Sequence, residues 1–439
     1  MLNHRVTSWA GALALVVLLA IPFATGCGSS SVTPTATPVL DLAVGNGDYD
    51  NEDNRVFVWL DALNNPAIGR VPDVLLEPED ELEYSQRVRY VRMAGEQLFV
   101  LATSNNYYSG QIMIWNDFRN IEGNPSPDIT LGHYDSGLSH PNYMAIHDGD
   151  LYVSNRGYNE VLIFRDVLTL EDGDEPDVIL GNDDLLRVQP PNGEHHYLSG
   201  PNGLAVSDTG LYVSLQDSNK VFVYWDPKTV ETGDQPDVVL GNPEPEEPQD
   251  PQVQPLFTGS QFAGVKHCFL EGNTLYVTCT RRRDGQANGV WAFSPANALT
   301  NYQAPDWIVG GPGYDDYPMC VRVGGGRLWV STRDYQTGLL GYDLPVAAGQ
   351  LPDIALMDQF FGDSAFQEPW DPEQGRFTFI PGHVDEFVTP AGGLVGVSRR
   401  SDAVFGYLDA ASATTNQAPD YVLWFPGMQN LYTIDAVVR

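Results

Sequence analysis

The stretch that decides the fold is a short phrase that the chain repeats. It reads Pro176-Asp-Val-Ile-Leu-Gly-Asn182, and again Pro236-Asp-Val-Val-Leu-Gly-Asn242. Weaker copies, each a Pro-Asp pair before a mostly apolar triplet, begin at Pro72, Pro127, Pro305, Pro352 and Pro419. The seven prolines are spaced 47 to 69 residues apart. A repeat of this length indicates that one supersecondary unit recurs along the chain.

Each phrase closes a longer unit, best seen from Pro141 to Asp166 and from Pro201 to Asp226. Four short β-rich runs, A to D, can be read in a unit, and D is the repeated phrase. The B runs begin near Leu42, Leu98, Leu151, Leu211, Leu275, Leu328 and Val395. The C runs begin near Val56, Ile112, Val161, Val221, Val290, Leu339 and Val404. Units of four strands at this period predict an all-β fold, a β-propeller with seven blades, or six or eight if one unit is miscounted.

The repeated phrase has a structural interpretation. As the last strand of its unit, D would lie at the outer edge of the blade with one side unpaired. Proline is tolerated at the first residue of an edge strand, and the neighbouring Asp adds a charge that discourages edge-to-edge association. Gly-Asn would then turn the chain back toward the centre.

The two ends of the repeat region complement each other. The region enters at 40–44 with a B strand, and 431–438 supplies the missing A strand. We therefore expect one domain over 39–439, a ring closed by N- and C-terminal strands within one blade.

The units at 141–166 and 201–226 resemble NHL-repeat propellers, through Pro-Asn-Gly-Leu-Ala-Val, Gly-Leu-Tyr-Val-Ser and Asn-Lys-Val-Phe-Val-Tyr. NHL units usually carry Asp after the Leu-Tyr-Val strand, where this chain has Asn155, Leu215 and Cys279. The resemblance implies a fold and a general binding role, but no reaction.

The N-terminus has the pattern of an export signal. A short basic region and the apolar run 10–23 precede Ala24-Thr-Gly-Cys27, which resembles a bacterial lipobox. The resemblance implies a signal peptide over 1–26, a lipid on Cys27 and a tether over 27–38. It further implies a protein of the bacterial cell envelope, and Gly28 after the Cys implies the outer membrane. An ordinary secretory signal with an incidental Cys is the alternative.

The charge and cysteine content restrict the classes of partner and the redox state that we expect. The chain carries 58 acidic and 23 basic residues, a net charge of −35. So acidic a surface repels nucleic acid and anionic lipid. Cations, glycans and envelope proteins remain as partners, and we expect a monomer. Of the cysteines beyond Cys27, Cys268 and Cys279 could pair across a hairpin, but buried free thiols, Cys320 included, are the favoured interpretation.

Two groups of residues could hold a metal. Histidines expected in D–A connections or early A strands are His133, His140, His195, His196, His267 and His383. Converging imidazoles suit Zn²⁺. Asn142 and Asn202 occupy matching Pro-Asn positions, and Asp385 and Glu386 enter the last A region. Their oxygens suit Ca²⁺ and loosely resemble the calcium site of gluconolactonase and paraoxonase propellers. The alternatives are loop histidines without a metal and Asn side chains that bond their own turns.

Aromatic residues share these connections. They are Tyr134, Tyr143, Tyr197, Phe257, Phe262, Tyr314, Tyr317 and Trp370. Aromatic faces on a polar rim suit sugars or a protein partner, and local loop packing is the alternative. The tyrosines of the B strands, by contrast, should be core.

Three functions follow from these patterns. The leading one is a membrane-anchored module that binds a ligand or protein through the rim formed by the D–A connections. The second is a metal-dependent (Ca²⁺ or Zn²⁺) hydrolase or lyase at the channel mouth, although no nucleophile elbow, HExxH, P-loop or CxxC pair appears. The third is a purely structural envelope component.

Overall fold

A computed structural model gives the architecture, and the described residues all belong to the compact unit Val39–Arg439. They are 40–46, 54–62, 70–78, 86–104, 109–132, 137–181, 198–241, 264–280, 288–311, 318–332, 339–347, 350–356, 370–371, 376–377, 384–388, 393–398, 403–414, 420–423 and 431–438. Among them, no helix has the length and apolar composition that crossing a bilayer requires.

These residues form seven four-stranded antiparallel sheets, which we number as blades and give from inner to outer strand. Blade 1 is β30 (Leu431–Val438), β1 (Leu40–Asn46), β2 (Val56–Trp59) and β3 (Val74–Leu76). Blade 2 is β4 (Gln86–Ala94), β5 (Gln97–Ser104), β6 (Gly110–Trp115) and β7 (Ile129–Leu131). Blade 3 is β8 (Pro141–His147), β9 (Asp150–Asn155), β10 (Glu160–Phe164) and β11 (Val178–Leu180).

The remaining blades repeat this order. Blade 4 is β12 (Pro201–Ser207), β13 (Gly210–Leu215), β14 (Lys220–Trp225) and β15 (Val238–Gly241). Blade 5 is β16 (Val265–Glu271), β17 (Thr274–Cys279), β18 (Asn288–Phe293) and β19 (Trp307–Gly311). Blade 6 is β20 (Pro318–Gly324), β21 (Arg327–Thr332), β22 (Leu339–Asp343) and β23 (Ile354–Leu356). Blade 7 is β26 (Val384–Val388), β27 (Leu394–Ser398), β28 (Ala403–Tyr407) and β29 (Tyr421–Leu423), and β24 (Trp370–Asp371) pairs separately with β25 (Arg376–Phe377).

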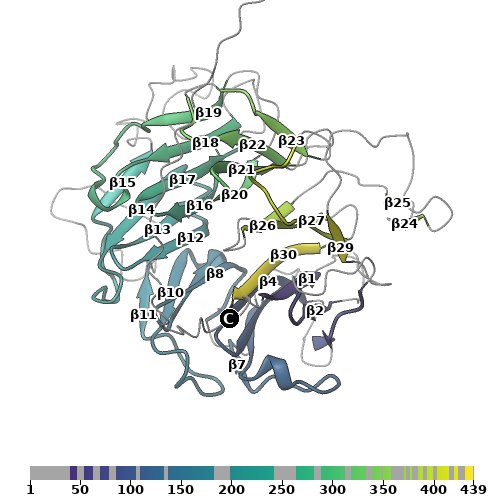
Figure 1. Cartoon of the computed structure of the whole chain (residues 1–439). Coiled ribbons are helices and arrows are strands. Elements are labelled where there is room, and N and C mark those ends of the chain that lie inside the picture. Colours follow the sequence, from purple (N-terminus) through teal and green to yellow (C-terminus); the bar gives the residue numbers. More distant parts are fainter. Residues whose placement is uncertain are drawn as a thin grey trace, which may run out of the picture. The chain divides into compact units, whose positions relative to one another are not determined.

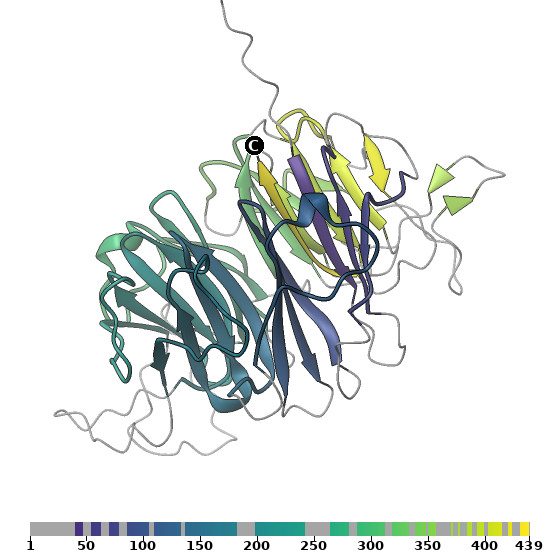
Figure 2. The ribbon, with the colours of Figure 1, turned by 90° about the horizontal axis from the view of Figure 1, so that it is seen from below.

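The blades close into a ring. Each inner strand contacts the inner strand of the next blade, and β26 of blade 7 returns to β30 of blade 1 (Figure 1). Seen from below in Figure 2, the strands of each blade lie side by side as a separate sheet. β30 pairs antiparallel with β1, so the predicted β-propeller and its closure by the two terminal strands are confirmed.

Apolar faces of neighbouring sheets pack together around the ring. The B-strand tyrosines Tyr152, Tyr212 and Tyr276 are all buried, as predicted, and belong to clusters shared between blades. Side chains along a strand point alternately to the two faces of its sheet, and in a closed ring each blade has a neighbour on both faces. This explains why the central strands are apolar almost throughout.

The aspartate of the repeated phrase makes the same two hydrogen bonds in all seven blades. In blade 3, the N–H of Asp177 donates to Ile163 O at 3.0 Å, and Asp177 Oδ2 accepts from the N–H of Arg165 at 2.7 Å. The carboxylates of the other six accept in the same way from the backbone N–H that ends strand C: Asp73, Asp128, Asp237, Asp306, Asp353 and Asp420. We call this arrangement the aspartate clip. It gives the Asp a direct role that the edge-charge interpretation did not foresee.

The outer edge is less open than predicted. The middle residue of β11, Ile179, accepts a hydrogen bond from the N–H of Gly233 at 3.0 Å and donates to Thr232 Oγ1 at 3.1 Å, and both partners lie in the next blade. Thr130 in β7 and Val239 in β15 are bonded likewise by the blade that follows. The expectation of an unpaired outer side is therefore wrong at these three blades, because the following loop supplies partners.

The glycine of the phrase turns the chain as expected. Gly181 has a φ of +96°, and a Cβ there would lie 2.2 Å from Leu198 Cδ1 and 2.6 Å from Asn159 O. Gly241 has a φ of +106°. Only glycine tolerates such a backbone at low cost.

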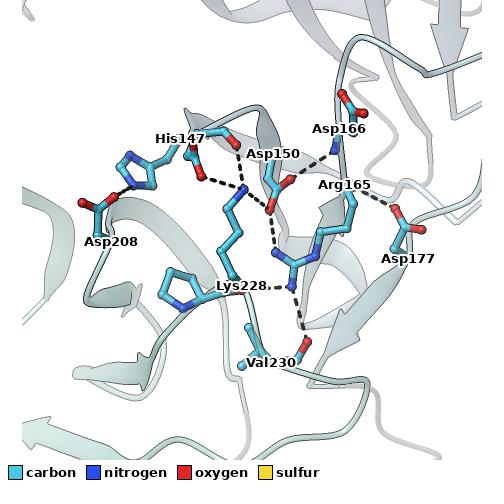
Figure 3. Close-up of polar contacts among 10 residues, drawn as sticks. His147, Asp150, Arg165, Asp166, Asp177, Asp208, Lys228 and Val230 are labelled. Atoms are coloured by element: carbon cyan, nitrogen blue, oxygen red, sulfur yellow. Dashed lines mark hydrogen bonds and ion pairs between the residues drawn. The ribbon is translucent and has the colours of Figure 1, made fainter.

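An ion cluster joins blades 3 and 4 (Figure 3). Asp150 is buried and accepts from Arg165 Nη1 at 2.6 Å, from the N–H of Asp166 at 3.1 Å and from Lys228 Nζ at 3.1 Å. Burial opposes ionisation of Asp150, but these donors outweigh it and hold the pKa of the carboxyl below its usual value. Nearby, His147 Nε2 lies 2.9 Å from Asp208 Oδ1.

The cysteines of the propeller are free thiols, as favoured from the sequence. The predicted hairpin is present, with Leu270 opposite Leu275 and Cys268 opposite Val277, and Val265 instead of a cysteine stands opposite Cys279. Burial raises the pKa of the Cys268 thiol to about 12.

Candidate functional site

The inner strands of blades 2 to 6 carry a β-bulge at the same position, and the pairing of β30 with β1 in blade 1 shifts there too, between Gly45 and Asn46. In β4 the register shifts between Val88 and Tyr90, which leaves Arg89 as the extra residue. The shifts in β8, β12, β16 and β20 fall between Pro141 and Tyr143, Pro201 and Leu204, Val265 and Cys268, and Pro318 and Cys320. Bulges re-aim side chains and are common beside active sites.

Hydroxyl groups of the B strands satisfy the backbone that these bulges expose. Ser214 Oγ accepts from the N–H of Gly203 at 2.7 Å, and Thr278 Oγ1 accepts from the N–H of His267 at 2.9 Å. Ser331 Oγ accepts from the N–H of Cys320 at 3.0 Å. In blade 3, Ser154 Oγ donates across to Asn202 O at 2.8 Å. The bulges are thereby fixed as parts of the fold.

The bulge residues line one hollow at the centre of the ring, which we call the channel hollow. Its bulge residues are Arg89, Asn142, Asn202, His267 and Met319. The other lining residues are Tyr90, Tyr143, Cys268, Phe269, Tyr276, Thr278, Cys320, Val321 and Arg322. The enclosed volume of the hollow is about 80 Å³, within a depression of about 700 Å³ that includes open solvent. A concave site with aromatic walls and a few placed polar groups is the usual form of a small-molecule site.

A polar chain links the bulges of blades 2, 3 and 4. Arg89 Nε donates to Asn142 Oδ1 at 3.0 Å, and Asn142 Nδ2 donates in turn to Asn202 Oδ1. Asn202 Nδ2 donates to Gln216 Oε1 at 3.1 Å, which also accepts from Arg156 of the 3₁₀ helix η3 (Arg156–Tyr158) at 3.5 Å. The two Asn side chains therefore bond across blades, and the alternative that each caps its own turn is not what the structure shows.

An aromatic series follows the same strands. The rings of Tyr90 and Tyr143 are 4.3 Å apart between centroids, and that of Tyr143 is 5.7 Å from His267. Tyr143 of blade 3 thus contacts His267 of blade 5, and Gly203 belongs to β12 of the blade between them. A Cβ on Gly203 would lie 2.8 Å from His267 Cα. The small residue thus permits the close approach of β12 and β16.

His140 lies just before β8 and is buried. Its backbone φ of +46° places it in the left-handed region, which a non-glycine residue rarely occupies. Burial first, and then the positive charges of Arg89, Arg156 and Arg87, lower the pKa of His140 to about 4. The imidazole is therefore neutral at physiological pH, and the arginines give this part of the ring a positive potential.

The structure brings only part of the predicted site together. Asn142, Asn202, Tyr143 and His267 meet in the channel hollow, and His140 lies beside its arginines. Asp385 and Glu386 lie in the inner strand β26, and Trp370 lies in β24. The following residues lie outside the described part of the chain: Cys27, His133, Tyr134, His195, His196, Tyr197, Phe257, Phe262, Tyr314, Tyr317 and His383.

A metal remains a prediction. In the described part of the chain, no three His, Cys, Asp or Glu side chains gather as a metal-binding group. Asn142 Oδ1, one of the oxygens expected to hold Ca²⁺, faces the guanidinium of Arg89 at 3.0 Å. A second cation at that oxygen would be repelled by the first.

The sequence did not direct attention to Arg89, Arg322 or the bulges. One signal was present: Ser or Thr follows the apolar core of four B strands, at Ser154, Ser214, Thr278 and Ser331. These are the hydroxyls that serve the bulges. A buried hydroxyl repeated at one strand position indicates an interrupted ladder beside it.

Comparison with known proteins supports the fold. The periplasmic gluconolactonase PpgL of Pseudomonas aeruginosa aligns with a TM-score of 0.53 and 17% identity, over 91% of this chain and 99% of that one. A protein of Bacteroides uniformis, named as a candidate 6-phosphogluconolactonase, aligns with a TM-score of 0.53 and 11% identity over the same shares. No protein-family model and no curated protein matches the sequence. At these identities the likeness concerns the β-propeller fold alone.

Proposed function

We propose that this protein is an extracytoplasmic β-propeller that binds a small molecule in the channel hollow. The observation that carries the proposal is the set of aligned bulges in blades 2 to 6, each of which contributes one residue to the same hollow. Each bulge gives up a ladder position, and a B-strand hydroxyl compensates in four of the blades. Such a recurring, supported irregularity indicates a binding role, because local strain concentrates at functional sites.

The membrane anchor forms part of the same proposal. The lipobox-like Cys27 would hold the propeller at the envelope, and the similar PpgL is itself named as periplasmic. The test is fractionation of cells that express the wild-type chain or Cys27→Ala. We expect the variant to move from the membrane to the soluble extracytoplasmic fraction. Equal distribution of both would favour the ordinary secretory signal.

Ligand binding can be tested with the purified full chain and a library of sugars, sugar acids and aromatic acids, read by thermal shift and then by calorimetry. We expect hits that Asn202→Leu abolishes, because that change breaks the polar chain and fills the hollow. Ser207→Ala, at the far end of the same strand β12, is the matched control. Hits that survive Asn202→Leu would place binding elsewhere, including the rim of D–A connections.

A metal-dependent hydrolase is the second candidate. Both similar structures carry lactonase names, and His267 offers an imidazole in the hollow. The test is hydrolysis of glucono-1,5-lactone by the purified chain, with Ca²⁺ or Zn²⁺ added and after chelation. Activity above the spontaneous rate that requires His267 would support this reading, and the uncatalysed rate in all samples would exclude it for this substrate.

A further inference from the structure

We infer that the channel hollow selects a small organic anion, with Arg89 as the residue that binds the anionic group. The inference rests on the proposed function, since it names the chemical class of the ligand held in that hollow. The sequence suggested a cation as the ligand, whereas this inference names an anion. Three independent observations lead to it.

The first observation is a pair of arginines in the hollow. The chain has a net charge of −35, yet two of the described residues that line the hollow are Arg89 and Arg322. Arg322 comes from β20 in blade 6 and Arg89 from β4 in blade 2. The negative charge of the whole protein repels anions, and two arginines at one site provide a local attraction for an anionic ligand.

The second observation is that Arg89 is held in place. Its Nε is bonded to Asn142 Oδ1, and Asn142 is fixed through Asn202 to Gln216. Each amide in this series directs an N–H away from Arg89 and an oxygen toward it. The guanidinium is thus oriented before any ligand arrives, which reduces the entropy lost when it binds a carboxylate or phosphate.

The third observation is that the walls suit a ring. The guanidinium of Arg322 lies 5.0 Å from the centre of the Phe269 ring, and Tyr90 and Tyr143 continue the aromatic surface. Flat apolar faces beside cations accommodate a molecule with a ring at one end and a negative group at the other. A sugar acid, an aromatic carboxylate and an aromatic phosphate share this chemistry.

The experiment compares matched probes by isothermal titration calorimetry of the full chain. The anions are D-glucuronate, benzoate and phenyl phosphate, and the neutral counterparts are D-glucose and benzamide. We expect at least one anion to bind and its neutral counterpart to bind at least about 10-fold more weakly, because a charge-assisted hydrogen bond is lost. Binding of the anion should weaken further as NaCl is raised.

Variants assign the role of Arg89. We expect Arg89→Gln to lower the affinity for the anion by about 10- to 100-fold. Arg327→Gln removes the same charge outside the hollow, where Arg327 pairs with Asp343, and should leave binding within about 2-fold, as expected for a screened distant charge. Melting temperatures report whether each variant folds.

The possible outcomes test the anion inference separately from the proposed ligand-binding function. Neutral probes that bind as tightly as the anions, with Arg89→Gln unchanged, would overturn the anion inference and leave the channel as a ligand site. Anions that bind but respond equally to Arg89→Gln and Arg327→Gln would overturn the role of Arg89. No binding of any probe at millimolar concentration would overturn the inference, whereas the library and Asn202→Leu experiment would decide the proposed function separately.

Discussion

Removing one aspartate clip tests the explanation of the sevenfold repeat. In Asp177→Ala the N–H of Arg165 loses its 2.7 Å acceptor. The bond resembles an N-cap, in which a side-chain oxygen accepts from a backbone N–H, so we expect a loss of about 1–2 kcal/mol in the free energy of unfolding. For roughly 400 residues the unfolding entropy is about 0.8 kcal/mol/K, which converts this loss into a fall of about 2 °C in melting temperature.

The assay is guanidinium unfolding of the full chain, supported by calorimetry. Asp177→Asn keeps an oxygen acceptor without the charge and should retain part of the stability. Glu175→Ala removes a charge from an exposed side chain two residues away and should have little effect. Because clips in different blades share no partners, removing those of blades 2, 3 and 4 together should cost about the sum of the single losses.

Two results would refute this reasoning. Equal stability of Asp177→Ala and the wild type would show that water replaces the carboxylate. If instead Asp177→Asn and Asp177→Ala were equally prone to aggregate while both stayed stable, the charge at the blade edge would be the relevant property.

The remaining predictions concern packing, acid stability and thiol reactivity. Gly203→Ala should reduce the free energy of unfolding by about 1–3 kcal/mol and weaken ligand binding, because its Cβ would meet the backbone of His267. Gly210→Ala would meet only side chains, Tyr212 at 3.1 Å and Trp225 at 3.2 Å, and should cost less in the same unfolding assay. The lowered pKa of Asp150 implies stability that is complete above its unfolded pKa, about 3.9, and is lost as pH falls through the folded value, so Asp150→Asn should flatten the acid limb of a stability–pH curve. Cys268, with its pKa raised to about 12, should resist iodoacetamide at pH 8 longer than the half-buried Cys320, as mass spectrometry would show.

Much of the fold could be predicted because the signals were repeated. The B and C strands begin close to the expected residues, and the terminal strand β30 pairs with β1 as expected. The alternation of apolar and polar residues in one segment is weak evidence for a strand, but the same alternation repeated in successive units is strong evidence. The role of Asp177 could not be predicted in detail, because its partner Arg165 is fixed only when strands C and D pair.

The candidate site could be predicted only in part, because it is built across blades. Asn142 and Asn202 were identified from matching positions in two units, but their bond to each other depends on how neighbouring blades face. Arg89 occupies the corresponding position in a unit whose sequence departs from the repeat, so comparison of units gave no reason to select it. Residues that differ at a repeated position can be the specific ones, since the repeat itself encodes the scaffold.

The closure of blade 1 also has a consequence for the order in which the protein can be completed. β1, the first strand of the propeller to be synthesised, pairs on one side with β30, the last. A chain that stops before residue 431 would therefore leave β1 as an exposed edge and blade 7 without its neighbour. Removing this one strand would therefore prevent closure of the ring. The truncated chain would expose the edge of β1 and tend to aggregate, and would not form a smaller propeller.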